Sequence, residues 1–318
     1  MVPFYSTMID VIIPVYKPKK TLITLLDALQ RQTKPAQNII LYNTEKALFE
    51  PFERQWKLRE RYANVQIFHH TKEEFDHGGT RRLGVSKSDA DVFVCMTDDA
   101  IPGDDTLLQT LYDGLMQREE VAVCYARQLP APDCRQIERY TRSFNYPEGS
   151  RLKGQQDAKE LGIKTYFCSN VCAAYKREIY DKLGGFVAHT IFNEDMIYAG
   201  NAVQQGYLIY YAADACVIHS HNYSMRQQFQ RNFDLGISQA EHPEIFAALK
   251  SESEGAKLVV NTAKYLLKNG HPFEIVRLVL HSAAKLLGYK LGRQYRKLPR
   301  RLVCAFAMNK VYVRKYLM

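Results

Sequence analysis

The chain has 318 residues, of which 46% are hydrophobic and 24% charged, and its formal net charge is +9. It contains no uninterrupted apolar stretch of membrane-spanning length, no charged leader with an apolar core, and seven cysteines without Cys-x-x-Cys spacing. These features argue against an integral membrane protein, an exported protein and a disulfide or zinc scaffold, and they favour a cytoplasmic globular protein with reduced core cysteines.

The first half of the chain alternates between strand and helix patterns. Residues 9–15 predict a buried strand, and residues 20–33 carry leucines at helical spacing. Further strands are expected at residues 38–42, 65–68, 91–96 and 121–126, and helices at residues 52–62, 79–86 and 104–117. This alternation predicts an α/β fold with a mostly parallel sheet flanked by helices.

The second half begins less regularly. Residues 130–164 mix prolines and glycines with polar and basic residues, which predicts a mobile loop or an acceptor-facing insertion. Strands are then expected at residues 167–175 and 207–211, with a continuation toward Ile218, and helices at residues 177–183, 193–205 and 225–235. The remainder is rich in predicted helices, and every charged residue after Glu274 is Lys or Arg, so it should seek an anionic surface.

Two adjacent carboxylates, Asp98 and Asp99, follow the strand predicted at residues 91–96. Ligands of open α/β sheets bind beyond the carboxyl ends of the strands, and hard divalent cations prefer carboxylate and phosphate oxygens. The pair therefore indicates a metal and nucleotide-diphosphate site, although the same residues also suit a plain strand-to-turn exit. Polar or turn residues follow the first two strands as well, so several segments should converge on one crevice: Pro14, Tyr16, Asn43, Thr44 and Glu45.

The segment from Phe75 to Arg81 combines a potential helix cap, two glycines and a cation. Its members Asp76, His77, Gly78, Gly79 and Arg81 could bind a diphosphate or a nucleobase edge through helix N-terminal amides and the guanidinium. The alternative is that Asp76 only caps the helix and the glycines only allow a turn.

Three further groups are candidates for chemistry. Glu194 and Asp195 open a predicted helix, where a carboxylate could act as a general base or simply complement the helix dipole. His219 and His221 share one face of a strand end, which leaves a metal ligand, a diphosphate contact and a plain polar strand end open. Arg231 follows on a helix three residues after Gln228, a spacing that is also common on solvated helix faces.

Together these motifs resemble the inverting family 2 glycosyltransferases with the GT-A fold, over about residues 9–240. The resemblance rests on the run from Val11 to Tyr16, on Asp98-Asp99, on Gly184-Gly185-Phe186 and on Glu194-Asp195. Within that family, the segment from Phe75 to Arg81 is similar to the signature of bacterial rhamnosyltransferases that use dTDP-L-rhamnose to build cell-surface polysaccharides.

The resemblance implies a Rossmann-like GT-A catalytic domain at residues 1–240, with a nucleotide-binding half (1–128) and an acceptor-binding half (129–240). A basic helical C-terminal extension would occupy residues 241–318. Asp195 would be the catalytic base of an inverting transfer, and Asp99, with His219 and assisted by Asp98, would bind Mg²⁺ or Mn²⁺. The implied donor-binding residues are Pro14, Tyr16, Asn43, Thr44, Glu45, Asp76, His77, Gly78, Gly79, Arg81 and Asp98, and the acceptor-side residues are Glu194, His221 and Arg231.

Some residues depart from the family pattern. Asn43-Thr44 stands where many relatives carry an Asp for the nucleobase, and Gln228 to Asn232 replaces the Gln-x-x-Arg-Trp of processive members. The second departure argues for the addition of one or a few sugars. Another donor, a UDP-hexose or a UDP-N-acetylhexosamine, stays possible. Two alternatives of another class are a catalytically inactive scaffold and a protein that binds a partner through its basic tail. No nucleic-acid motif supports nucleic acid as that partner.

Residues 276–287 can form an amphipathic helix. Val276, Leu280, Ala283 and Leu287 share one helical stripe, while Arg277, His281 and Lys285 fall on another. The pattern is typical of an interfacial helix that would hold a peripheral enzyme on the inner face of the cell membrane, near a polyprenyl-diphosphate-linked acceptor. Packing on the catalytic domain and a homodimer contact are the alternatives.

Overall fold

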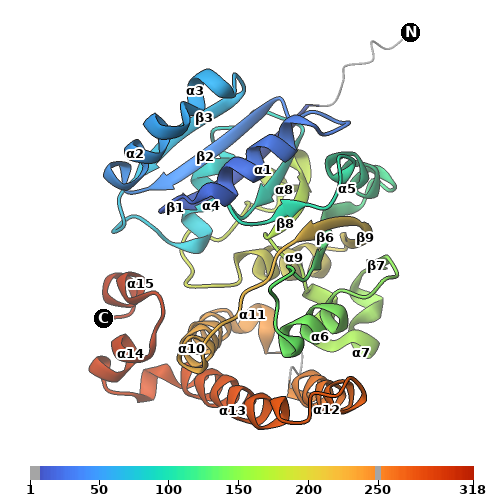
Figure 1. Cartoon of the computed structure of the whole chain (residues 1–318), viewed down its shortest axis with the longest axis vertical. Coiled ribbons are helices and arrows are strands. Elements are labelled where there is room, and N and C mark those ends of the chain that lie inside the picture. Colours follow the sequence, from blue (N-terminus) through green and yellow to red (C-terminus); the bar gives the residue numbers. More distant parts are fainter. Residues whose placement is uncertain (1–7, 248–251) are drawn as a thin grey trace.

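In the computed structural model, which describes residues 8–247 and 252–318, a mixed sheet forms the centre of the molecule (Figure 1). Within the described residues the strand order is β3-β2-β1-β4-β8-β6-β9-β5, and β7 pairs with β9 outside this path. The strands are β1 (Ile9–Tyr16), β2 (Asn38–Thr44), β3 (Val65–His70), β4 (Val92–Met96), β5 (Ile101–Pro102), β6 (Val121–Leu129), β7 (Arg151–Lys153), β8 (Cys172–Lys176) and β9 (Leu208–Ile218).

The parallel part of the sheet comprises β3, β2, β1 and β4, and the antiparallel β8 joins it to β6 and β9. Successive residues of a strand point to opposite faces, so Val11 and Ile13 enter one core cluster while Ile12 enters the other. Burial on both faces explains why this strand is apolar throughout. The predicted α/β class and the mostly parallel sheet are confirmed.

Helices cover both faces of the sheet. One core cluster contains residues of α1 (Lys20–Gln30), α2 (Lys46–Trp56) and α5 (Leu107–Met116). The other contains residues of α4 (His77–Val85), α8 (Arg177–Lys182) and α9 (Glu194–Gln204). The remaining elements before the C-terminal region are α3 (Leu58–Arg61), α6 (Gln136–Asn145), α7 (Ala158–Leu161) and two 3₁₀ turns at Gln155–Asp157 and Gly162–Tyr166.

Three sequence predictions need correction. The helix expected at residues 52–62 begins earlier, at Lys46, and a left-handed Lys57 divides it into α2 and α3. The strand expected at residues 167–175 begins only at Cys172. Residues 130–164 are not a loop: they contain α6, β7 and α7, and β7 is held by its pairing with β9, a long-range contact that local sequence patterns do not reveal.

The C-terminal region is helical, as predicted. It contains α10 (Met225–Glu241), α11 (Pro243–Phe246), α12 (Glu252–Lys268), α13 (Glu274–Arg293), a 3₁₀ turn (Tyr295–Lys297), α14 (Arg300–Phe306) and α15 (Lys310–Tyr316). These helices lie along the side of the molecule opposite α1–α3 (Figure 1). In the described part of the chain, no helix combines the length and apolarity needed to cross a membrane.

Helices α10 and α13 cross at a glycine contact. A Cβ atom added to Gly292 would lie 2.1 Å from the carbonyl oxygen of Phe233, and one added to Gly288 would lie 2.3 Å from that of Phe229. Only glycine allows two helix backbones to approach this closely. The C-terminal region therefore packs on the preceding helix α10, which is one of the alternatives predicted for it. The predicted domain boundaries at residues 128 and 240 stay predictions.

Candidate active site

The carboxyl end of β4 meets the chain that precedes β8. Because β4 and β8 are antiparallel, the end of one strand lies beside the start of the other, with Met96 opposite Cys172. The Thr97 N–H donates to the Val171 carbonyl at 3.2 Å. Asp98 and Asp99 are thus held at the same edge of the sheet as Asn170, and this edge is where the sequence predicted a crevice.

A carboxylate and two imidazoles gather just beyond this edge. β5 pairs with β9, which places Asp99 beside the residues that follow Ile218. Asp99 Oδ1 lies 3.4 Å from His219 Nε2, and Asp99 Oδ2 lies 3.3 Å from His221 Nε2. Their potential ligand atoms all lie within 4.8 Å of one another. His221, which the sequence assigned to the acceptor side, belongs to this group as well.

A hydrogen-bond network orients His219. The Gln128 amide oxygen accepts from the Arg142 guanidinium, which has no acceptor of its own, and lies 3.0 Å from His219 Nδ1. Because an amide oxygen only accepts, His219 Nδ1 must be the donor of this hydrogen bond. Such an outer contact is the usual support of a metal-ligating histidine, so this group fits a divalent cation with mixed oxygen and nitrogen ligands.

The two neighbouring carboxylates have different electrostatic environments. Burial, followed by the charge of Asp99, raises the pKa of Asp98 to about 7. Burial also raises the pKa of Asp99, but the hydrogen bond and charge of His219 outweigh it and lower that pKa to about 2. Burial and the charge of His219 lower the pKa of His221 to about 4. Asp99 is therefore ionised and His221 neutral at pH 7, the states that metal ligation requires.

A second acidic group opens α9. The Asp195 carboxylate accepts a 2.9 Å bond from the Asn170 N–H, and the Asn170 side chain donates to Glu194 Oε1 at 3.0 Å. Glu194 Oε1 lies 2.9 Å from Arg81 Nη1, and both side chains are buried. Asn170 thus connects Asp195 to the edge that carries Asp98 and Asp99.

Glu194 and Asp195 differ in their electrostatic environments, because the buried Arg81 forms its ion pair with Glu194. Although burial opposes ionisation, the charges of Arg81 and His77 hold the pKa of Glu194 below its usual value. Burial and the negative charge of Glu194 raise the pKa of Asp195 to about 7. The half-buried Asp195 can therefore accept a proton near neutral pH, as a general base does.

Several residues of the segment from Phe75 to Arg81 have partners within the protein. Asp76 caps α4 by accepting from the Gly79 N–H and lies 3.0 Å from His189 Nδ1. A Cβ on Gly78 would lie 2.3 Å from the Val187 carbonyl oxygen, so this glycine is required by packing. The cap is the structural role that the sequence left open for Asp76, and Gly78 is needed for close packing. Arg81 and Glu194 are buried as a pair, and their assignment to the donor and acceptor sides stays a prediction.

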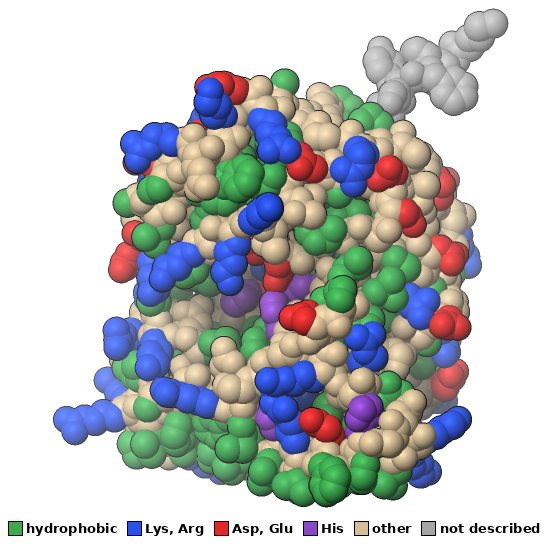
Figure 2. Space-filling model, viewed as in Figure 1, with side chains coloured by type: hydrophobic (Ala, Val, Ile, Leu, Met, Phe, Trp, Pro, Cys, Tyr) green, Lys and Arg blue, Asp and Glu red, His purple; other side chains and the backbone are tan. Residues whose placement is uncertain are grey.

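His77, in contrast, faces a cavity of about 270 Å³ between the sheet and the C-terminal helices. Tyr16 and Thr44, from the ends of β1 and β2, line the same cavity, whose wall is completed by Lys72, Phe75, Phe192, Arg231, Asp234, Met308, Asn309 and Val311. Figure 2 shows histidine side chains in a hollow between these two parts of the molecule. Arg231, predicted on the acceptor side, lines this cavity together with Tyr16 and Thr44.

The other residues expected at this edge do not line the cavity. Asn43 is buried, and its amide nitrogen lies 3.1 Å from His69 Nδ1. The Glu45 carboxylate accepts from the Lys72 N–H, and Pro14 is half-buried in β1.

Sequence reasoning missed four contributors: Gln128, Arg142, Asn170 and the 308–311 segment. None of them lies in a motif. The segment reaches the pocket because Asp234 of α10 accepts N–H bonds from Met308 and Asn309 at 3.1 and 2.9 Å.

The sequence profile of glycosyl transferase family 2 matches residues 10–184. The chain belongs to glycosyltransferase family 2. It is 40% identical over 307 residues to the O-antigen chain rhamnosyltransferase RfbN of Salmonella typhimurium, covering 96% of this chain and 95% of that protein. It is 39% identical to the O-antigen chain rhamnosyltransferase WbaN of Salmonella anatum, covering 90% and 89%.

Solved structures of glycosyltransferases share this fold. The mannosyltransferase PcManGT from Pyrobaculum calidifontis, in complex with GDP-Man and Mn²⁺, superposes with a TM-score of 0.58 at 16% identity, covering 99% of this chain and 88% of its own. TarS of S. aureus in complex with UDP-GlcNAc gives a TM-score of 0.52 at 12% identity, covering 91% and 92%. The predicted GT-A fold and family are thus confirmed for this glycosyltransferase.

Proposed function

We propose that this glycosyltransferase moves L-rhamnose from dTDP-L-rhamnose, with inversion, onto a hydroxyl of a saccharide precursor of a cell-surface polysaccharide. The observation that carries the donor assignment is the 40% identity to an O-antigen chain rhamnosyltransferase over nearly the whole of both chains. Replacement of the processive Gln-x-x-Arg-Trp motif supports the addition of one or a few residues.

In this mechanism Asp195 takes the proton of the acceptor hydroxyl. The hydroxyl oxygen attacks the anomeric carbon of rhamnose, and the bond from that carbon to the diphosphate oxygen breaks, so dTDP leaves with the electron pair. The raised pKa of Asp195, about 7, suits a base that must hold this proton at neutral pH. Asn170 and the Arg81–Glu194 pair are positioning residues, because each acts through Asp195.

Asp99, His219 and His221 would hold the divalent cation, with Asp98 beside them. When bound, the metal would neutralise charge on the nucleotide diphosphate. Two imidazoles in the ligand set favour Mn²⁺ over Mg²⁺, which binds oxygen almost exclusively. Tyr16, Thr44 and His77 would line the nucleotide pocket.

The acceptor is proposed to be lipid-linked, and the enzyme to lie peripherally on the cytoplasmic face of the membrane. Eight large apolar side chains are more than half exposed on α12, on α13 and in the turn between them: Val260, Leu267, Phe273, Val276, Val279, Leu280, Leu286 and Leu287. In Figure 2 apolar side chains gather along the lower edge, where Figure 1 places these helices. A homodimer through the same face is the competing arrangement.

The test measures thermal stability with dTDP-rhamnose, UDP-glucose and UDP-GlcNAc, each with Mn²⁺ or EDTA, since a ligand that binds only the native state raises Tm. We expect a Mn²⁺-dependent rise with dTDP-rhamnose alone. Asp195→Asn should keep that rise while rhamnose transfer to a lipid extract falls roughly 10²-fold or more. A preference for a UDP-sugar would replace the donor, and near-normal transfer by Asp195→Asn would remove Asp195 as the base.

A further inference from the structure

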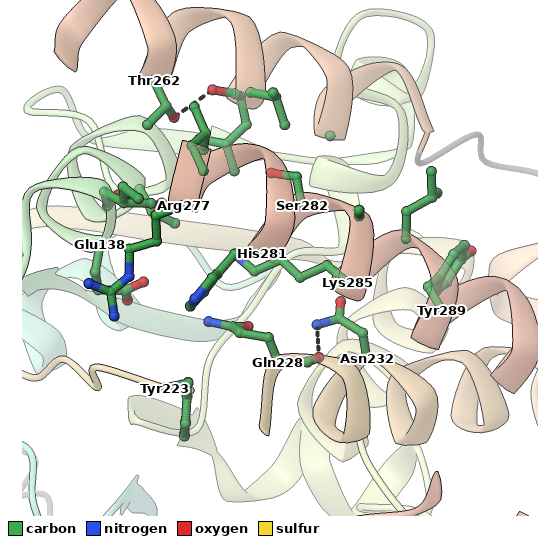
Figure 3. Close-up of a pocket in the computed structure, with 18 of the residues that line it drawn as sticks. Glu138, Tyr223, Gln228, Asn232, Thr262, Arg277, His281, Ser282, Lys285 and Tyr289 are labelled. Carbon is green, nitrogen blue, oxygen red and sulfur yellow. Dashed lines mark hydrogen bonds between the residues drawn. The ribbon is translucent and has the colours of Figure 1, made fainter. Parts of the chain in front are cut away.

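Helix α13 is oriented with its apolar stripe outward and its cationic stripe inward. Val276 and Leu287 are 66% and 55% exposed. Arg277, His281 and Lys285, on the other stripe, point toward α6 and α10 and line a cavity that is open to solvent on one side (Figure 3). The glycines of α13 pack on α10, but this packing explains neither the exposed apolar stripe nor the cations that line the cavity.

The cavity formed by α6, α10, α12 and α13 has a volume of about 610 Å³. Its walls are largely apolar, with Ile137, Leu235, Leu258, Val259, Leu278 and Leu286 among the lining residues. A cavity of this size and character is typical of a site for an organic ligand with an apolar portion.

The charge inside the cavity is strongly unbalanced. Four lining residues are Arg or Lys: Arg135, Arg277, Lys285 and Lys290. The lining carboxylate, Glu138, already pairs with Arg142 at 2.8 Å. Within the described parts of the chain, no carboxylate lies within ion-pair distance of Arg277 or Lys285. Burial, partly offset by Glu138, lowers the pKa of Lys285, so an anion bound beside it would restore the charged form.

One wall of the cavity contains a residue of the Asp99, His219 and His221 group. His221, whose Nε2 lies 3.3 Å from Asp99 Oδ2, lines the cavity together with Asn222 and Tyr223. A ligand in the cavity therefore reaches the catalytic edge at one end. At the other end it meets α12 and α13, whose outer faces are apolar.

We propose that this cavity binds the diphosphate and the first apolar units of a lipid diphosphate that carries the acceptor saccharide. This inference rests on the proposed transfer to a saccharide hydroxyl. Arg277 and Lys285 bind the diphosphate oxygens, the apolar walls hold the start of the lipid chain, and the saccharide extends past His221 toward Asp195. The lipid source is favoured over a free phosphate because the walls are apolar and the outer face of α13 suits a membrane surface.

The experiment uses the full chain with Mn²⁺ and saturating dTDP, so that the donor site is filled. Binding of farnesyl diphosphate, farnesol and inorganic pyrophosphate is measured by isothermal calorimetry. We expect farnesyl diphosphate to bind, and Lys285→Gln and Arg277→Gln each to weaken it about 10-fold or more, the worth of a charge-assisted hydrogen bond. Lys285→Arg should retain most of the affinity. Lys264→Gln is the matched control, since Lys264 is an exposed α12 lysine outside the cavity.

The outcomes separate the two proposals. Failure of the wild-type protein to bind dTDP would count against the proposed function, whereas normal dTDP binding without farnesyl diphosphate binding would overturn this inference alone. Equal binding of pyrophosphate would overturn the lipid assignment. Equal binding of farnesol, or an effect of Lys264→Gln as large as that of Lys285→Gln, would overturn the anion site.

Discussion

Arg81 Nη1 lies 2.9 Å from Glu194 Oε1 in the interior, and the backbone places Asp195 next to this pair. Burial and then the charge of Glu194 raise the pKa of Asp195 to about 7. Glu194→Gln removes that charge and leaves Arg81 to favour ionised Asp195. Since a base works only when deprotonated, the low-pH limb of kcat/KM should move down by roughly one pH unit.

Glu194→Asp keeps the charge, so it should leave the limb closer to its wild-type position. Denaturant unfolding should also show that Glu194→Gln loses about 3 kcal/mol, because a buried guanidinium remains unpaired. A pH limb that stays in place while stability falls would assign Glu194 a purely structural role.

Asp99→Asn should abolish the Mn²⁺-dependent increase in Tm with dTDP, because a neutral amide is a weaker ligand for a hard cation. His221→Ala should weaken Mn²⁺ at least about 10-fold in a metal titration, because it removes a ligand from the group of three. His271→Gln, which alters a histidine outside that group, should change nothing. An unaltered metal response in Asp99→Asn would place the cation elsewhere.

Asp234 is buried, and burial raises its pKa from 3.8 to about 7 even though it accepts N–H bonds from Met308 and Asn309. The native state thus holds a proton that the unfolded state releases near pH 4. The stability this proton provides is fully present below pH 4 and is lost as the pH rises through 7.

Asp234→Asn removes this titration. Between pH 4 and 7, the free energy of unfolding of the variant, measured in urea, should therefore increase relative to that of the wild type. The variant also loses one hydrogen bond from a backbone N–H. The cost of that loss is the same at every pH, so it does not affect how the difference in unfolding free energy changes with pH. A constant difference across this range would show that Asp234 is ionised throughout.

Gly292→Ala should destabilise the protein, although alanine is the better helix former by about 1 kcal/mol. The new Cβ would lie 2.1 Å from the Phe233 carbonyl oxygen, so α10 and α13 would have to separate. Gly255→Ala on α12 is the control, because its Cβ would meet nothing within 4 Å. Thermal unfolding should lower Tm for the first variant and keep or raise it for the second.

The double variant Val276→Ser/Leu287→Ser should bind anionic phospholipid vesicles at least about 10-fold more weakly, since each side chain would bury apolar area worth more than 1 kcal/mol. Leu48→Ser alters a side chain on α2 that is 43% exposed and should leave sedimentation with vesicles unchanged. A double variant that binds vesicles normally but no longer self-associates in light scattering would assign this face to a dimer.

The sequence alone determined the fold class and the family, and it predicted Asp98, Asp99 and Asp195 as site residues. Apolar runs such as residues 9–15 predict buried parallel strands because both faces of such strands are covered. Asp98 and Asp99 were found because they follow such a run, and the position of Asp195 at a helix start was found through the resemblance. Each of these signals lies within one short segment of the sequence, so it can be recognised without knowing how the chain folds.

Tertiary structure decided which of these residues act together. The pairing of β5 with β9 brings His221 to Asp99, and the burial of Arg81 with Glu194 separates the roles of Glu194 and Asp195. No local pattern reveals that Gln128 orients His219, that the segment from Met308 to Val311 lines a cavity with Tyr16 and Thr44, or that α13 turns its cations inward. Each depends on contacts between distant segments, whose geometry and electrostatics exist only once the chain has packed.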